Sequence, residues 1–245
     1  MNLKDKIIIV TGSEGLIGKY IVNNIKLNGG TALRLDILNK NNLTQNKFFL
    51  DVSSKKSINE TLKLISGKYK KIDGLVNNAY PKTDDWGKKF EETSEDSFSK
   101  NVELQLSSIF KIIKPISKLM IKEKYGSIVN ISSIYGIVGN DFSIYENTNL
   151  TSPVAYSAIK SGLIGLNRYL CSYLGKYGIR SNCVSPGGVF NKQNNIFVSQ
   201  YCKKVPLNRM ANPGDISPIV SFLLSDDSSY ITGQNIAVDG GWTAI

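Results

Sequence analysis

Residues 7–18 read Ile-Ile-Ile-Val-Thr-Gly-Ser-Glu-Gly-Leu-Ile-Gly, and this segment is the strongest indication of the fold class. The apolar run at its start predicts a buried strand, and the segment from about Gly15 to Leu27 predicts a helix. Glycines at G-x-x-G-x-x-G spacing join the two, so the backbone can turn tightly and approach a pyrophosphate at the helix N-terminus. We therefore expect a dinucleotide to bind against Gly12, Glu14, Gly15, Leu16, Ile17 and Gly18.

The same alternation of strand and helix continues along the rest of the chain. Short runs rich in β-branched residues follow helical stretches, as in parallel strands that helices cover on both faces. The predicted fold is α/β: a single-domain, Rossmann-type, doubly wound parallel sheet flanked by helices over residues 1–245. The further strands are expected at Thr31–Asp36, Phe48–Leu50, Asp73–Asn77, Gly126–Ile131, Arg180–Ser185 and Ile236–Asp239.

The composition excludes several kinds of site. The chain has 245 residues, a formal net charge of +10 and no histidine, which excludes a Ser-His-Asp triad and a His-ligated zinc. We expect no metal site. The lysines are scattered, which predicts a solvated basic surface and no nucleic-acid partner. Three cysteines without framework spacing, no leader segment and no apolar run long enough for a membrane helix predict a cytoplasmic protein with no membrane partner.

The second predicted strand ends at Asp36, 18 residues after Gly18. A carboxylate at this place can accept hydrogen bonds from the ribose hydroxyls of an adenosine and repels a 2′-phosphate, which favours NAD over NADP. Arg34 lies on the same strand face two residues earlier, so NADP stays possible. A strand-end aspartate that only caps a turn is the alternative for Asp36.

Tyr156 and Lys160 are four residues apart, so on a helix they share one face about one turn apart. A nearby ammonium group lowers the pKa of a phenol from its ordinary ~10 and favours the phenolate. Such a tyrosine can take a proton from an alcohol or give one to a ketone. Taken alone, the pair also fits an exposed helix face without chemistry.

The ordered set of motifs resembles the short-chain dehydrogenase/reductase family nearly end to end. The resemblance rests on Thr11–Gly18, Asp51-Val52, Asn77-Asn78-Ala79, Ser133, the Tyr156–Lys160 pair, Pro186-Gly187 and the segment 231–241. It implies that Tyr156 is the acid/base, that Lys160 assists it and holds the nicotinamide ribose, and that Ser133 donates to the substrate oxygen. It also implies cofactor contacts at Asp51, Val52, Asn78, Ala79, Pro186, Gly187 and Val189.

Three features depart from the family pattern: the glycine spacing, the proton-relay residue and the length of the segment between Ser133 and Tyr156. The glycine spacing differs from the family's commoner G-x-x-x-G-x-G, so we expect a slightly altered turn. The family often carries an asparagine on the helix before the serine-bearing strand, which relays protons through water to the lysine. Matching Leu106–Phe110 to that pattern puts Gln105 at this catalytic position, with Asn101 one helical turn earlier as the alternative.

Three polar segments are expected to be irregular substrate loops: residues 80–92, 139–153 and 191–205. The second contains an insertion, because Ser133 and Tyr156 are 23 residues apart, against nearer a dozen in the family. Its polar residues predict a loop that covers the substrate site and suits a polyhydroxyl substrate. The alternative is a surface loop that does not contact a ligand. Together with Tyr80 and residues 132–136, it resembles a bacterial subgroup associated with flagellin and surface-polysaccharide modification, including sialic-acid-like sugars.

The predicted function is an NAD(P)-dependent oxidoreductase that transfers a hydride between nicotinamide and an alcohol or ketone carbon of a small polar, sugar-derived substrate. The alternative enzyme is a nucleotide-sugar epimerase or dehydratase that recycles its NAD internally. The alternative without chemistry is a nicotinamide-sensing protein. By resemblance, we expect a homotetramer or a homodimer.

Overall fold

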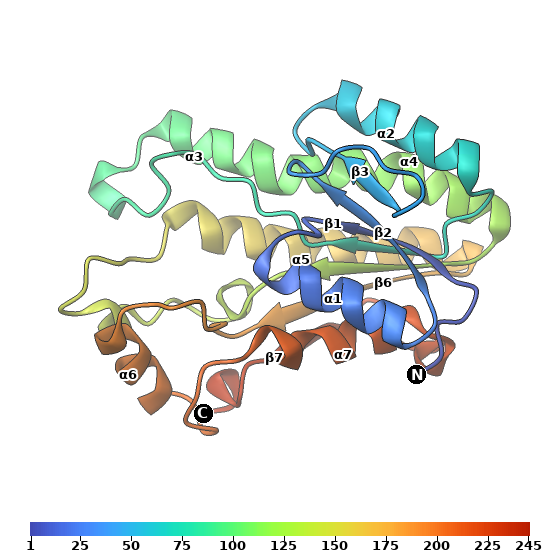
Figure 1. Ribbon diagram of the computed structural model, residues 1–245. Helices are drawn as coiled ribbons and strands as arrows, with labels where there is room; N and C mark the ends of the chain where they lie inside the picture. Colours follow the sequence, from blue (N-terminus) through green and yellow to red (C-terminus); the bar gives the residue numbers. More distant parts are fainter.

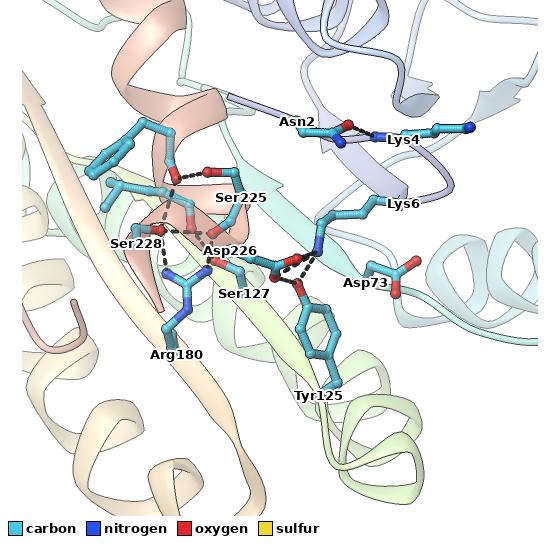
Figure 2. A network of polar contacts seen from close by, with 12 residues as sticks. Asn2, Lys4, Lys6, Asp73, Tyr125, Ser127, Arg180, Ser225, Asp226 and Ser228 are labelled. Atoms are coloured by element: carbon cyan, nitrogen blue, oxygen red, sulfur yellow. Dashed lines mark hydrogen bonds and ion pairs between the residues drawn. The ribbon is translucent and has the colours of Figure 1, made fainter. Parts of the chain in front are cut away.

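The computed structural model of the protein describes residues 1–245 and contains one seven-stranded sheet (Figure 1). The strand order is β3-β2-β1-β4-β5-β6-β7, and every neighbouring pair is parallel. The strands are β1 Ile7–Thr11, β2 Thr31–Asp36, β3 Lys47–Phe49, β4 Gly74–Asn77, β5 Gly126–Ile131, β6 Ile179–Pro186 and β7 Asn235–Val238.

The sheet reverses its winding direction beside β1. The chain runs outward from β1 to β2 and β3, and then returns to place β4 on the other side of β1. In open α/β sheets, ligands bind in the crevice beyond the carboxyl ends of the strands at such a reversal. Here that crevice lies beyond Thr11, the last residue of β1, and Asn77, the last residue of β4.

Helices cover both faces of the sheet (Figure 1). One buried cluster joins the sheet to α2, α4 and α5, and a second joins it to α1 and α7. None of the helices is long and apolar enough to cross a membrane. They are α1 Leu16–Leu27, α2 Lys55–Lys68, α3 Glu95–Val102, α4 Ser108–Glu123, α5 Val154–Leu174, α6 Asn195–Lys203 and α7 Pro213–Leu224.

A π-helical turn, Glu103–Ser107, joins α3 to α4. It packs against α5, where a Cβ atom added at Gly162 would lie only 2.9 Å from Leu106. Isolated π turns of this kind often occur at functional sites. This one contains Gln105, so the local geometry singles out the residue that the sequence predicts as a proton relay.

The predicted doubly wound α/β sheet is confirmed, and each predicted strand overlaps an observed one. The prediction of irregular structure throughout residues 191–205 is wrong, because α6 occupies most of that segment. The Asn194 side chain accepts a hydrogen bond from the Ile196 N–H at 2.7 Å and caps the helix. Phe197 and Tyr201, four residues apart, are both buried on one helix face.

A third buried cluster lies near the carboxyl ends of the strands and is separate from the clusters on the two sheet faces. It joins the turn after β5, the insertion, α6 and the end of the chain. Within it the rings of Tyr201 and Trp242 stack with centroids 4.7 Å apart. The cluster consists of Ile134, Tyr135, Ile144, Phe197, Tyr201, Val205, Met210 and Trp242.

Candidate active site

Tyr156, Lys160 and Ser133 meet at the carboxyl ends of the strands. Tyr156 and Lys160 lie on the first two turns of α5, and Ser133 follows β5 by two residues. Because α5 packs against β6 and against the turn after β5, its first turns face the end of the sheet. All three residues line one cleft of about 490 Å³.

Hydrogen bonds of its side chain and of its backbone carbonyl fix Lys160 in this cleft. Its Nζ atom donates to the Ile131 carbonyl at 2.9 Å, while its own carbonyl accepts a hydrogen bond from the Ser132 hydroxyl at 3.0 Å. The Nζ atom lies 5.5 Å from the centroid of the Tyr156 ring. Desolvation by burial lowers the pKa of Lys160 to about 8, so the group still carries a positive charge at neutral pH.

Burial has the opposite effect on Tyr156. It raises the pKa of the Tyr156 phenol, and the Ser133 hydroxyl partly offsets that rise. Ser133 is itself held in place, because its Oγ atom accepts a hydrogen bond from the Tyr135 N–H at 3.2 Å. The phenol is therefore neutral at neutral pH even with Lys160 nearby, and it becomes a proton acceptor only when a further positive charge or a reacting alcohol lies beside it.

The glycine turn after β1 leaves no room for larger residues. Gly12 has φ +63°, and an added Cβ at Gly18 would lie 2.0 Å from the Gly12 carbonyl oxygen. Asn78 supports the turn by donating from Nδ2 to the Gly12 carbonyl at 2.9 Å. Gly15 ends the turn, and α1 starts at Leu16. Despite its altered spacing, the turn thus keeps a bare backbone in front of a helix N-terminus, which fits a pyrophosphate.

Asp36 lies at the other end of the expected cofactor path. Its Oδ2 atom accepts the Glu14 N–H at 2.9 Å, and its Oδ1 atom accepts the Leu38 N–H at 3.0 Å. Each carboxylate oxygen keeps a lone pair for a ribose hydroxyl. The Arg34 guanidinium, which could have bound a 2′-phosphate, pairs instead with Glu14 at 2.6 Å. This arrangement suits an unphosphorylated adenosine ribose.

The structure brings the predicted cofactor residues together in two connected places. One group lines the 490 Å³ cleft: Leu16, Ile17, Asn78, Tyr156, Lys160, Pro186, Gly187 and Val189. A second group lines a hollow of about 220 Å³: Gly12, Asp36, Asp51, Val52 and Ala79. Tyr80 lines both and marks the boundary between them. Glu14, Gly15 and Gly18 line neither, and they lie in the turn itself or in the first turn of α1.

Gln105 and Asn101 have different surroundings. Gln105 is buried, and neither of its amide atoms has a hydrogen-bond partner among the protein's groups. A buried amide of this kind normally needs a partner such as a bound water. Asn101 is fully engaged, because it accepts the Thr83 N–H at 3.1 Å and donates to the Thr83 hydroxyl at 2.7 Å and the Ser97 carbonyl at 2.8 Å.

Four aromatic residues around Tyr156 had no predicted role. Tyr80, Trp86 and Tyr135 each meet the Tyr156 ring edge to face, with centroids 5.9, 6.3 and 6.5 Å away. Tyr145 comes from the insertion and lines the same cleft. The sequence offered one signal for three of them, since Tyr80, Trp86 and Tyr145 lie in two of the polar segments predicted to form substrate loops. Their meeting around Tyr156 depends on the tertiary fold.

The chain is similar in sequence to several known proteins. A family model described as enoyl-(acyl carrier protein) reductase matches residues 34–243. The chain is 38% identical to the post-translational flagellin modification protein A of Campylobacter coli, over 98% of this chain and 99% of that protein. It is 35% identical to a 3-oxoacyl-(acyl-carrier-protein) reductase of Buchnera aphidicola, over 98% of each chain.

A solved structure shares the fold. It is a short chain dehydrogenase from Leptospira borgpetersenii with bound NAD+, which is 33% identical to this chain. The two superpose with a TM-score of 0.88, over 99% of this chain and 94% of that one.

Proposed function

The chain belongs to the short-chain dehydrogenase/reductase family, and from that premise we propose that it interconverts an alcohol and a ketone on a sugar-derived substrate with NAD. One observation carries the proposal: Tyr156, Lys160 and Ser133 line the same cleft as the residues predicted to hold the nicotinamide end of the cofactor. A site that only sensed nicotinamide would not need these three groups beside an open substrate space.

Each of the three groups has a distinct role in this proposal. Tyr156 takes the proton from the alcohol during oxidation and returns it to the ketone oxygen during reduction. Lys160 stabilises the phenolate by its charge and holds the nicotinamide ribose. Ser133 donates a hydrogen bond to the reacting oxygen. Bound nicotinamide supplies or accepts the hydride.

Gln105 is proposed to continue the proton route from Lys160. The buried amide of Gln105 has no hydrogen-bond partner in the protein, so it can bind one or two waters. The amide of Asn101, in contrast, forms its hydrogen bonds with other protein groups. Asn101 is instead proposed to position the segment 80–92, because its partner Thr83 lies between Tyr80 and Trp86 in that segment.

NAD is proposed as the cofactor in preference to NADP. Support comes from the free lone pairs of Asp36, from the Glu14–Arg34 ion pair and from the NAD+ in the Leptospira relative. A 2′-phosphate would meet the carboxylate of Asp36 and find the nearest guanidinium already paired.

The sugar assignment rests on the polar segments and on the flagellin-modification relative. Residues of the segments 80–92, 139–153 and 191–205 line the cleft, and they bring hydroxyl and amide groups to it. The proposed setting is flagellin or surface-glycan modification, with a sialic-acid-like sugar as one candidate, in the cytoplasm. The relatives that reduce 3-oxoacyl groups give a second candidate substrate, a β-keto thioester.

The proposed assembly is a homotetramer or homodimer. Support comes from exposed aromatic side chains on the long helices α4 and α5, where Phe110, Tyr169 and Tyr173 are 51%, 63% and 52% exposed. Light scattering of the purified chain tests this point, and a monomer at micromolar concentration contradicts it.

Nicotinamide absorbance tests the reaction class. The purified chain is mixed with NAD or NADP and with sugars, sugar acids, sugar phosphates, nucleotide sugars, nonulosonic acids and an acetoacetyl thioester. Net NADH formation with a sugar-derived alcohol, or its consumption with the ketone, supports the proposal. Conversion of a nucleotide sugar without net NADH indicates an epimerase or dehydratase, and turnover of the thioester alone indicates an acyl reductase.

A further inference from the structure

The substrate part of the cleft has almost no charge. Among the cleft residues Lys160 is the only cation, and none is a carboxylate. Burying a carboxylate or a phosphate costs free energy unless a cation or several donors pair with it. Since the proposed function commits Lys160 to Tyr156 and the cofactor, no charged partner remains there for an anionic substrate group.

The remaining polar groups match hydroxyls. Thr151 contributes a hydroxyl group from the insertion, and Asn191 contributes an amide from the segment before α6. Hydroxyl and amide groups both donate and accept, so they can pair with sugar hydroxyls in either direction. The Tyr135 hydroxyl, on another cleft residue, is buried without a hydrogen-bond partner.

Tyr145 is the one phenol that the insertion adds to this cleft. Its ring lies against Phe197 of α6 with centroids 5.4 Å apart, and the preceding Ile144 is buried in the third core cluster. Burial raises the pKa of Tyr145, so its hydroxyl stays neutral and can both donate and accept a hydrogen bond.

The backbone on both sides of Tyr145 is fastened to α6. The Nε2 atom of Gln200 donates to the Ile144 carbonyl at 2.9 Å and to the Glu146 carbonyl at 3.0 Å. At the start of the insertion, Asp141 pairs with Lys204 at 2.9 Å. The ring is thus held in the cleft by several contacts with α6, as a residue that fixes a ligand needs to be.

We propose that Tyr145 determines substrate specificity by binding a hydroxyl of an uncharged, polyhydroxylated ring seated in the cleft. This inference rests on the proposed function and narrows it. A sugar seated by a carboxylate, as a nonulosonic acid could be, does not fit the charge of the cleft, whereas a neutral sugar ring does.

The first test compares matched sugars with the full chain and NAD. D-glucose, D-glucuronate and D-glucose 6-phosphate share one ring and differ by a single anionic group, and the galactose series repeats the comparison. We expect the neutral sugar of at least one series to have a kcat/KM at least about tenfold above both of its anionic counterparts. An anionic member that leads its series by that factor overturns the inference and leaves the proposed function intact.

The second test removes one hydroxyl. Tyr145→Phe keeps the ring that packs on Phe197, so we expect KM for the best neutral sugar to rise about tenfold while kcat and NADH binding stay within about threefold. Tyr230→Phe is the matched control, because it removes the same hydroxyl from a fully exposed tyrosine that does not line the cleft. An unchanged KM in Tyr145→Phe overturns the inference. Absence of turnover with every sugar, while NADH still binds, contradicts the proposed function and removes this inference with it.

Discussion

The Nη2 atom of Arg34 lies 2.6 Å from the Oε1 atom of Glu14. This ion pair lies beside Asp36, whose carboxylate is expected to select the cofactor. Glu14 also donates its backbone N–H to Asp36 at 2.9 Å, so the three residues form one connected unit. Side chains of Arg34 and Glu14 are 21% and 17% exposed, so solvent screens the pair only in part.

The first prediction concerns cofactor choice. Glu14→Gln removes a negative charge near the ribose and frees Arg34 to bind a 2′-phosphate, so the preference for NAD over NADP in kcat/KM falls by about tenfold. Glu60→Gln is the control, because this side chain is 65% exposed on α2 and far from the turn in sequence. An unchanged or stronger NAD preference in Glu14→Gln means that the ion pair has no part in selectivity.

The second prediction separates Gln105 from Asn101. Gln105→Ala removes an amide without protein partners, so kcat falls about tenfold or more, while KM and the free energy of unfolding change little. Asn101→Ala removes three hydrogen bonds and lowers the free energy of unfolding by about 2–3 kcal/mol. Steady-state kinetics and urea denaturation measure both. If only Asn101→Ala slows proton transfer, the relay is Asn101.

The third prediction follows from the pKa of Lys160, which burial lowers to about 8 against ~10.4 in an unfolded chain. Between these two values the unfolded state binds a proton that the folded state does not, so this group makes stability rise with pH across that window. The free energy of unfolding of wild type, relative to that of Lys160→Met, should therefore increase from pH 8 to pH 10 by on the order of 2–3 kcal/mol.

Urea denaturation of both forms at pH 7, 8, 9 and 10 measures this difference. Other lysines and tyrosines that titrate in the same range are present in both proteins and cancel in the comparison. A difference that is flat from pH 8 to pH 10 would show that Lys160 is solvated in the folded protein.

The fourth prediction concerns the glycine turn. A Cβ at Gly18 would lie 2.0 Å from a backbone oxygen, so Gly18→Ala must displace the turn and is expected to lose NADH binding and about 2 kcal/mol or more of stability. Gly67 in α2 has no atom within 4 Å of its added Cβ, so Gly67→Ala should bind NADH normally and gain about 0.5–1 kcal/mol. NADH fluorescence and thermal unfolding measure these outcomes. Normal NADH binding in Gly18→Ala contradicts the assigned role of the turn.

The sheet could be predicted because its strands are short, mostly apolar and separated by helices. Ile7–Thr11 and Gly126–Ile131 are covered on both faces, and burial leaves an apolar or β-branched run in each, Ile7–Thr11 itself and Ile128-Val129. The signal for α6 is weaker, because Asn194 and the residues before it have the composition of a loop. Only the burial of Phe197 and Tyr201 against other segments gives that helix its apolar face.

The site was predictable where its residues lie close together in sequence and less so where distant segments meet. The spacing of Tyr156 and Lys160 gives their shared helix face directly. The sequence placed Arg34 beside Asp36 but could not show that Glu14, 20 residues away, pairs with its guanidinium. In the same way, the polar composition of the insertion indicated a substrate roof, while the placement of Tyr145 depends on contacts from Gln200, 56 residues beyond Ile144.

Hydride transfer by Tyr156→Phe, measured together with NADH binding, tests the proposed acid/base role of Tyr156 most directly. The variant keeps the ring in place and removes only the hydroxyl that we propose transfers the proton. We predict that kcat for the best substrate falls by at least about a hundredfold, while the Kd for NADH stays within about threefold of wild type. A Tyr156→Phe enzyme that keeps more than a tenth of the wild-type kcat would contradict the central claim that Tyr156 is the acid/base of this protein.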